Sequence, residues 1–408
     1  MSPLLTLILA IVCFDFVVER ILNYLNAKRW NPELPAEAMG IYNAERYRKS
    51  QEYFLVNNRF GNITSIFQFL LITGMLLIGG FGILDTQIHE WISNPIPAAL
   101  IFFGILGFAS DIIGLPFSIY KTFVIENKFG FNRTSISTFI KDKLKGYILG
   151  IILGGSIFSL LIWIYLHTGV YFWLLAWAVT GTFLLLATMF YTSWILPMFN
   201  KLSPLPPGDL RSAIESYSKK VSFDLTDIFI MDGSKRSSKA NAFFSGFGKS
   251  KKIVLFDTLL EKHTTEELVA VLAHEIGHYK LKHTRTGFFL AFIQSGIMFY
   301  ILSLFLGNPA LANAMHANAS SFEIDILAFG LLYSPLSSIL GIIMNIVSRR
   351  NEFQADDYAR TTFNGVPLSS ALKKLSSDSL SNLNPHPAYV FVHYSHPPLL
   401  QRLRALMK

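Results

Sequence analysis

Long apolar stretches without basic residues dominate the chain. Lys and Arg are absent from residues 60–120, 146–200 and 286–348. Each stretch is long enough for two helical crossings of a bilayer, which need about 20 residues each. Together with an apolar run near the N-terminus they predict seven crossings, at residues 4–25, 62–84, 96–119, 147–166, 171–196, 287–306 and 324–347. No basic segment precedes the first run, so we expect it to be retained rather than cleaved as a signal peptide.

A more polar segment, 201–285, separates the fifth predicted crossing from the sixth. Its apolar residues have the spacing of a helix in some stretches and the spacing of a strand in others. The predicted elements are helices at 209–221 and 266–280, a strand at 227–231, and a hairpin formed by 242–247 and 252–256 around Gly248, Lys249 and Ser250. The segment Thr264-Thr265-Glu266-Glu267 is a capping start for the second helix. This segment therefore predicts a small α/β domain.

The fold class that follows is mainly α, a multi-pass membrane protein with one α/β insertion. We divide it into an N-terminal membrane region with five crossings (1–200), the α/β domain (201–285), crossings six and seven (286–348) and C-terminal helices (349–408). Composition agrees, because 51% of the residues are hydrophobic, only 15% are charged, and the mean hydropathy is +0.41. The single cysteine, Cys13, excludes an intramolecular disulfide.

The net charge is +8, and the basic residues are distributed unevenly along the chain. The predicted loops 85–95, 167–170 and 307–323 carry no Lys or Arg, whereas 26–59, 121–145 and the segments after Lys201 and Arg349 are basic. By the positive-inside rule the N-terminus lies outside, and the C-terminus and the α/β domain are cytoplasmic. The basic charge is thereby explained by membrane topology, so we expect a lipid bilayer and no nucleic acid as partner.

The segment from His274 to His278 has the pattern HExxH within the predicted helix 266–280. Positions i and i+4 share one helix face, so the two imidazoles can bind one zinc ion. Glu275 lies beside that face, where a carboxylate can act on the attacking water. This pattern predicts a catalytic zinc site rather than a helix without a metal.

A catalytic zinc needs a third protein ligand and an open position. Glu352 is the best candidate, because the last predicted crossing returns the chain to the side of His274 and His278. Asp356 follows one turn later and is placed to accept a hydrogen bond from a ligand histidine. The alternative for this acidic pair is a solvated helix face paired with Arg349 and Arg350.

The other histidines are less specific. His263 and His283, near the ends of the predicted zinc helix, are typical of capping or surface positions. Three histidines lie in the predicted outside loops and therefore cannot reach a cytoplasmic metal. These are His89, His167 and His316. The tail contains His386, His393 and His396. In the tail, Pro397 and Pro398 fix the backbone after His396 and can aim its imidazole at the metal, but composition does not choose among the three.

The predicted hairpin before the HExxH helix indicates how a substrate is held. An extended peptide can add to the edge of a sheet as a further strand and lie across the metal. The alternative is that the hairpin only packs against the domain.

Several motifs together resemble the type I CAAX prenyl protease family, the Ste24-like membrane metalloproteases of peptidase group M48. They are HEIGH (274–278), SRRNEFQAD (348–356), SHPPLLQRL (395–403), ENKFGFN (126–132), DGSKRSS (232–238), ANAFF (240–244) and IVLFDTLL (253–260). They occur in the family's order and span nearly the whole chain.

The resemblance implies a barrel of seven transmembrane helices around a water-filled chamber, closed by a gluzincin-like zinc domain on the cytoplasmic side. It makes His274, His278 and Glu352 the ligands of one Zn²⁺ per chain and Glu275 the general base. It implies that Asn241 contacts the backbone of the substrate. His396 and Arg402 are implied near the substrate and the developing oxyanion, with Asp356 supporting a ligand.

The family's substrates include proteins that end in a prenylated CAAX cysteine, from which the last three residues are removed. The short outside loops and the short tail of this chain, which lacks an obvious retrieval signal, resemble bacterial members. We therefore expect a peptide or protein substrate, prenylated or not. The membrane is the cell membrane in a bacterium and the endoplasmic reticulum in a eukaryote. The rival readings are a quality-control protease of the HtpX type, with about four crossings, and a non-enzymatic membrane protein with a structural zinc site.

Overall fold

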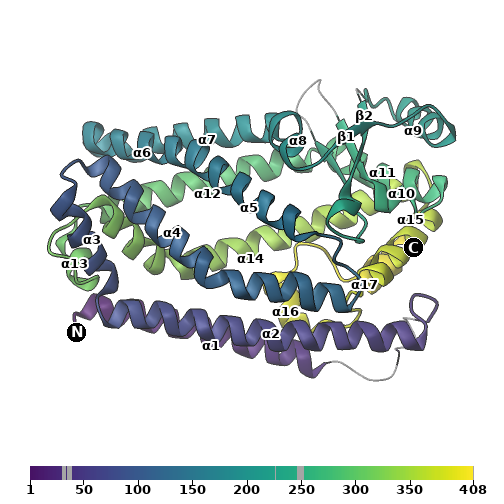
Figure 1. The fold of residues 1–408 in the computed structure, drawn as a ribbon. Helices are drawn as coiled ribbons and strands as arrows, with labels where there is room; N and C mark the ends of the chain where they lie inside the picture. The colour runs from purple at the N-terminus through teal and green to yellow at the C-terminus, as the bar shows by residue number, and fades with distance from the viewer. Residues whose placement is uncertain (30–33, 35–38, 226, 246–251, 408) are drawn as a thin grey trace.

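Long helices lie lengthwise beside one another, and a small sheet with short helices gathers at one end of them (Figure 1). The computed structural model describes residues 1–29, 34, 39–225, 227–245 and 252–407. The longer helices are α1 (Pro3–Lys28), α2 (Ala44–Leu77), α4 (Pro95–Ile119), α5 (Ile136–Leu149), α6 (Gly155–Thr168), α7 (Phe172–Phe190), α12 (His283–Phe305) and α14 (Phe322–Thr362).

Shorter helices connect these elements and build the end that holds the sheet. They are α3 (Gly80–Trp91), α8 (Leu196–Phe199), α9 (Asp209–Lys220), α10 (Asp257–Leu260), α11 (Thr265–Lys280), α13 (Pro309–Ala314), α15 (Gly365–Asp378), α16 (Pro387–His393) and α17 (Leu399–Leu406). Three π-helical segments continue α4, α5 and α7, at Tyr120–Glu126, Gly150–Gly154 and Tyr191–Ile195.

Among the described residues, five helical segments are long and apolar enough to cross a membrane, which confirms a mainly helical multi-pass protein. They are Ala44–Leu77, Pro95–Glu126, Ile136–Phe199, His283–Phe305 and Phe322–Thr362. The third of these has 64 residues and turns back on itself at Gly169–Tyr171, where Gly169 has a φ of 51°. Large apolar side chains cover the outer faces of these segments, as expected where lipid replaces water.

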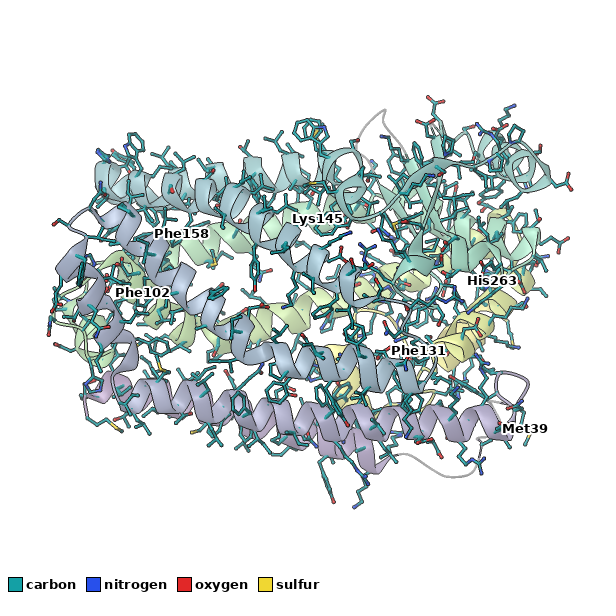
Figure 2. The ribbon with its side chains drawn as sticks, in the orientation of Figure 1. Met39, Phe102, Phe131, Lys145, Phe158 and His263 are labelled. Carbon is teal, nitrogen blue, oxygen red and sulfur yellow. The ribbon has the colours of Figure 1, made fainter. Side chains whose placement is uncertain are left out.

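Aromatic rings fill the space between the long helices near α3 (Figure 2). Phe102 is fully buried, and Phe103 meets both Phe102 and Phe158 edge to face at 5.3 and 5.2 Å between ring centroids. Edge-to-face contacts of this kind add about 0.5–1.5 kcal/mol to the burial of apolar surface. This end of the molecule therefore has a packed core of its own.

The prediction of a second crossing at 62–84 is wrong about where the helix ends and about the loop that follows it. α2 ends at Leu77, Gly79 takes a left-handed conformation with a φ of 69°, and α3 occupies most of the predicted outside loop 85–95. Glycine adopts this conformation without the steric cost that other residues meet, so the apolar run divides into two helices at this point.

The sheet has four strands in the order β1-β2-β4-β3, at Leu202–Pro204, Asp227–Met231, Lys252–Phe256 and Ala242–Ser245. β3 and β4 form the predicted antiparallel hairpin, and its predicted turn at residues 248–250 lies outside the described residues. β2 pairs with β4 in parallel, and β3 lies at one edge. β1 was not predictable from the sequence, because three residues are too few for a period-2 pattern.

Two of the predicted divisions fall inside continuous helices. Residues 285 and 286 both belong to α12, and residues 348 and 349 both belong to α14. α14 therefore runs as one helix of 41 residues, with Pro335 inside it, from the far end of the long helices to the sheet end (Figure 1). Glu352 near its C-terminus thus lies on the same helix as part of the membrane region.

Candidate active site

A capping box starts α11 and also ties it to α15. Thr264 accepts a hydrogen bond from the Glu267 backbone N–H, and Glu267 accepts one from the Thr264 N–H at 3.0 Å. The same buried carboxylate accepts hydrogen bonds from Ser370 at 2.6 Å and Lys374 at 2.8 Å. Burial raises the pKa of Glu267, but the hydrogen bonds from Lys374, Ser370 and the backbone outweigh it, so the pKa is lowered. The carboxylate stays charged and fixes the start of the helix.

A glycine lets α11 approach α14 closely. A Cβ on Gly277 would lie 3.2 Å from the Cα of Ala355 and 3.1 Å from Cδ1 of Tyr358. Contacts this short require the neighbouring helix to shift. The glycine inside the HExxH pattern therefore brings α11 against the turn of α14 that carries Glu352.

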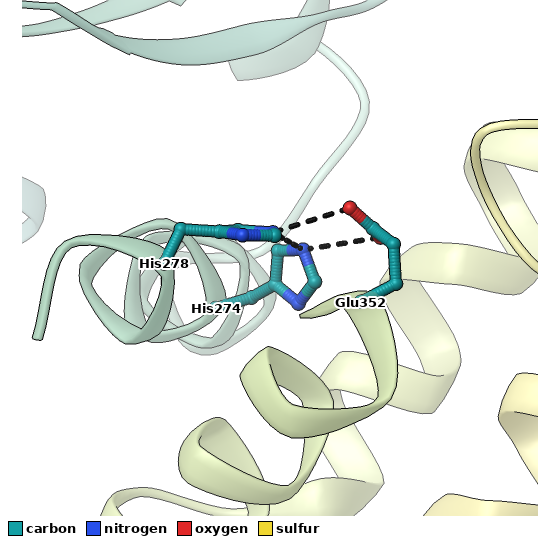
Figure 3. A group of neighbouring side chains, drawn as sticks. All are labelled: His274, His278 and Glu352. Atoms are coloured by element: carbon teal, nitrogen blue, oxygen red, sulfur yellow. Dashed lines mark hydrogen bonds and ion pairs between the residues drawn. The ribbon is translucent and has the colours of Figure 1, made fainter. Parts of the chain in front are cut away.

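His274, His278 and Glu352 converge between these helices, as Figure 3 shows. The Nε2 atoms of the two histidines are 3.1 Å apart. Glu352 Oε2 lies 3.5 Å from His274 Nε2, and Oε1 lies 3.2 Å from His278 Nε2. Ligand atoms around a tetrahedral zinc with bonds of about 2.0–2.1 Å are about 3.3 Å apart, so these distances suit one ion.

The chemistry of these donors also fits a metal. Glu352 is buried, and among the described residues its Oε2 makes no hydrogen bond, although Arg402 Nη1 lies 3.3 Å away. Two imidazole nitrogens and one carboxylate form a typical ligand set for a catalytic transition-metal site. The site can therefore hold one metal ion and leave a position open toward the cavity.

Asp356 and Arg402 stand behind the three donors. Asp356 Oδ1 lies 2.9 Å from His274 Nδ1, on the side of the ring away from Glu352. Arg402, on α17, donates two hydrogen bonds to the same carboxylate. In the absence of a metal, burial lowers the pKa of His274, but contact with Asp356 and Glu352 outweighs it and raises the pKa to about 9.

The alternative of a solvated acidic face paired with Arg349 and Arg350 is wrong. Glu352 and Asp356 are both buried. Arg349 instead donates to the backbone carbonyls of Val390 and Tyr394. The acidic pair belongs to the interior between α11, α14 and α17.

His283 is one residue that the sequence analysis assigned wrongly. It is buried rather than at the surface, and its Nδ1 lies 3.1 Å from Nδ1 of His278. Its Nε2 lies 3.0 Å from Gln354 Oε1. His283 and Gln354 therefore orient His278 from behind, and no pattern along the chain marks either residue for this contact. His263 is also buried, against the Leu259 carbonyl at 3.1 Å.

A cavity of about 880 Å³ opens in front of the three donors. The predicted site residues that line it are Asn241, His274, Glu275, His278, Glu352, His396 and Arg402. Burial raises the pKa of Glu275, and the nearby histidines only partly oppose this, so its pKa is raised overall. Burial therefore favours the protonated form of this carboxyl group while no metal is bound.

Asn241 and His396 border the cavity from different elements. Asn241 immediately precedes β3, and its carbonyl accepts a hydrogen bond from the Phe256 N–H at 3.1 Å. The His396 side chain is 64% exposed, and its Nε2 lies 3.4 Å from Glu352 Oε1. The other two tail histidines lie elsewhere, because His386 caps α16 and His393 lies 3.4 Å from Glu19.

Comparisons with known proteins agree with this arrangement. Residues 23–201 match the family model described as CAAX prenyl protease N-terminal, five membrane helices, and residues 204–408 match the model of peptidase family M48. A CAAX prenyl protease 1 homolog of Arabidopsis thaliana is 37% identical over 383 residues, which cover 92% of this chain and 90% of the relative. The corresponding Homo sapiens homolog is 33% identical over 419 residues, with 91% and 88% covered. The crystal structure of S. mikatae Ste24p superposes with a TM-score of 0.94 at 31% identity and covers 100% of both chains.

Proposed function

Because the chain belongs to peptidase family M48 and carries the CAAX prenyl protease N-terminal domain, we propose that it is an integral membrane zinc endopeptidase that processes CAAX-type C-termini. The observation that carries the proposal is the convergence of His274, His278 and Glu352 in a cavity that Glu275 also lines. The substrate is a membrane-associated protein whose last three residues are removed after a prenylated cysteine.

The three donors would hold a zinc ion, which when bound would supply Lewis-acid polarisation of the scissile carbonyl and would lower the pKa of water toward about 7. Glu275 takes the proton of the attacking water and later donates it to the leaving amine. Its position in the lining of the cavity, beside the three donors, suits both transfers. No covalent intermediate with the protein is required.

The substrate adds to the exposed edge of β3 as a further strand. β3 is the edge strand next to the cavity, and the pairing partner on its other side is β4. Main-chain hydrogen bonds along such an edge fix an extended peptide without reading its side chains. Asn241, at the start of the strand, binds the substrate backbone beside the metal.

His396 stabilises the oxyanion that forms on the scissile carbonyl. Its imidazole is the exposed one of the two candidates, whereas Arg402 is buried and directs Nε and Nη2 to Asp356. Donors aimed at a developing oxyanion contribute on the order of 10²–10³ in turnover. We therefore infer that Arg402 lies behind Glu352 and orients this ligand. The stabilisation of the oxyanion is assigned to His396.

The membrane architecture extends the proposal. The turn at Gly169–Tyr171 divides the Ile136–Phe199 segment into two helices, and α1 is a further long apolar helix, which supports seven crossings in place of five segments. We propose that these crossings surround a chamber. Basic loops support a cytoplasmic active site and C-terminus. The match to five membrane helices in residues 23–201 favours this arrangement over a quality-control protease of the HtpX type. The host membrane, bacterial or eukaryotic, stays a prediction.

The test is hydrolysis of a farnesylated CAAX peptide by the purified protein in detergent, with zinc content measured on each sample. We expect Glu275→Gln to retain zinc and lose turnover by about 10²–10⁴-fold, and His274→Ala to lose both. Glu266→Gln, an exposed carboxylate on the same helix, is the matched control and keeps full activity. Wild-type rates in Glu275→Gln contradict the base assignment. A folded, zinc-loaded wild type that cleaves only unprenylated peptides contradicts the CAAX assignment.

A further inference from the structure

A second group of metal-binding side chains lies at the end of the long helices remote from the active site. It comprises Asp85 and His89 on α3 and Glu323 in the first turn of α14. Glu352 follows Glu323 on the same helix by about 29 residues, which is about 44 Å at 1.5 Å per residue. In Figure 1, α3 and α13 lie at the opposite end from α11. The group is therefore separate from the catalytic centre.

The geometry of this group suits a single ion. Asp85 and His89 are four residues apart and share one face of α3. His89 Nε2 lies 3.0 Å from Glu323 Oε1 and 3.7 Å from Asp85 Oδ1. These distances bracket the separation of about 3.3 Å between ligands of a tetrahedral zinc. One ligand atom from each residue lies within 4.8 Å of the other two.

The carboxylates are buried without a Lys or Arg partner. Glu323 is 1% exposed and Asp85 4% exposed, and among the described residues His89 is the only Lys, Arg or His side chain within ion-pair distance of either. Glu323 Oε2 is fully enclosed and makes no hydrogen bond within the described part of the chain. Lys and Arg are absent from residues 60–120, 146–200 and 286–348, so these stretches contain no Lys or Arg that could pair with the two carboxylates. Buried charges need a partner or a metal, because leaving water costs several kcal/mol per ion.

The surrounding backbone holds the group in place. Gly82 packs against the loop before α14, where an added Cβ would lie 2.2 Å from the His316 carbonyl oxygen. Ser321 donates a hydrogen bond to Asp85 Oδ1 at 2.8 Å, and Asn318 donates one to Thr86 at 3.2 Å. The elements that carry the donors are thereby fixed to each other from both sides of the group, which pre-organises them for a ligand.

We propose that Asp85, His89 and Glu323 bind a second, structural transition-metal ion, Zn²⁺ or one with similar ligand preferences. One imidazole with two carboxylates favours zinc over calcium or magnesium, which prefer oxygen ligands alone. The side chain of His89 is 34% exposed, so the ion can enter from solvent and take water as a further ligand. The bound ion neutralises the buried carboxylates and fastens α3 to the start of α14.

The experiment counts zinc without relying on activity. In the full-length His274→Ala/His278→Ala variant the catalytic site is removed, and we expect one zinc per chain after dialysis into buffer without free metal. Adding His89→Ala reduces this to none, whereas adding Glu90→Gln, an exposed neighbour on α3, leaves one. Zinc should also raise the midpoint of thermal unfolding of the double variant, but not that of the triple variant with His89→Ala.

A folded, monodisperse double variant without zinc overturns the proposal, and so does a triple variant that keeps its zinc. If His89→Ala fails to fold, calorimetric titration of metal-free wild type with zinc decides the question. Two binding events per chain support the second site. One event overturns it.

Discussion

Arg402 on α17 binds Asp356 on α14 through two parallel hydrogen bonds, Nε to Oδ2 at 2.8 Å and Nη2 to Oδ1 at 2.6 Å. Burial lowers the pKa of Arg402, but the pairing with Asp356 outweighs it and raises the pKa, so the guanidinium stays charged. The same carboxylate lies 2.9 Å from His274 Nδ1. The C-terminal helix is thereby connected to a ligand histidine on α11 through one side chain.

Arg402→Lys should weaken metal binding rather than the chemical step. Lysine cannot reproduce the two-point contact, so Asp356 and Glu352 lose their fixed orientation. We expect metal affinity to fall by about 10–100-fold, with turnover per bound zinc close to wild type at saturating zinc. Arg404→Lys, on the exposed side of α17, is the control. Turnover that stays low in zinc-saturated Arg402→Lys would instead assign Arg402 to the oxyanion.

His396→Ala should retain zinc and lose turnover. Within the described part of the chain, the polar contacts of this exposed imidazole are with Ser395 and Glu352. Loss of one oxyanion donor costs about 10²–10³ in kcat. Zinc content and steady-state rates measured beside His393→Ala, which lies against Glu19, separate the roles. Zinc lost from His396→Ala would show that His396 is a metal ligand.

Gly277→Ala should separate α11 from α14. The added methyl group meets the Ala355 backbone at 3.2 Å, so Glu352 moves relative to His274 and His278. Overpacking of this kind costs about 1–3 kcal/mol of unfolding free energy, and Gly277→Val should cost more. Gly330→Ala, where a Cβ meets nothing within 4 Å, is the control. Thermal unfolding and zinc content are the measurements, and unchanged values in Gly277→Val would refute the close-approach argument.

Glu267→Gln should lower stability at neutral pH and lose that effect in acid. The folded-state pKa of Glu267 is lowered, so its stabilising contribution is fully present above the unfolded value of about 4.3 and is lost as pH falls through the lower folded value. We expect a loss of about 1 kcal/mol at pH 7. Denaturation midpoints of wild type and variant from pH 8 to pH 3 test this, with Glu266→Gln as control. A difference that grows toward acid would reverse the assigned sign.

Local periodicity explains which parts of the fold were predictable. The apolar stretches, the helix 209–221, the hairpin and the capped HExxH helix all follow from spacing within a few residues, and the structure confirms them. The end of the second crossing was not predictable in this way, because the left-handed turn at Gly79 leaves the run of apolar residues unbroken. The roles of the site residues stay predictions, although all of them except Asp356 line one cavity.

The sequence by itself determined that His274 and His278 share a helix face, since an α-helix repeats every 3.6 residues whatever surrounds it. It also determined that α14 could carry Glu352 back toward them. Only the tertiary structure decided which tail histidine borders the cavity, that His283 supports His278, and that His89 meets Glu323. His396 and His89 reach Glu352 and Glu323 through the packing of segments far apart in the chain, whereas His283 is five residues from His278 but on the next helix. All three contacts depend on how whole surfaces pack rather than on local spacing.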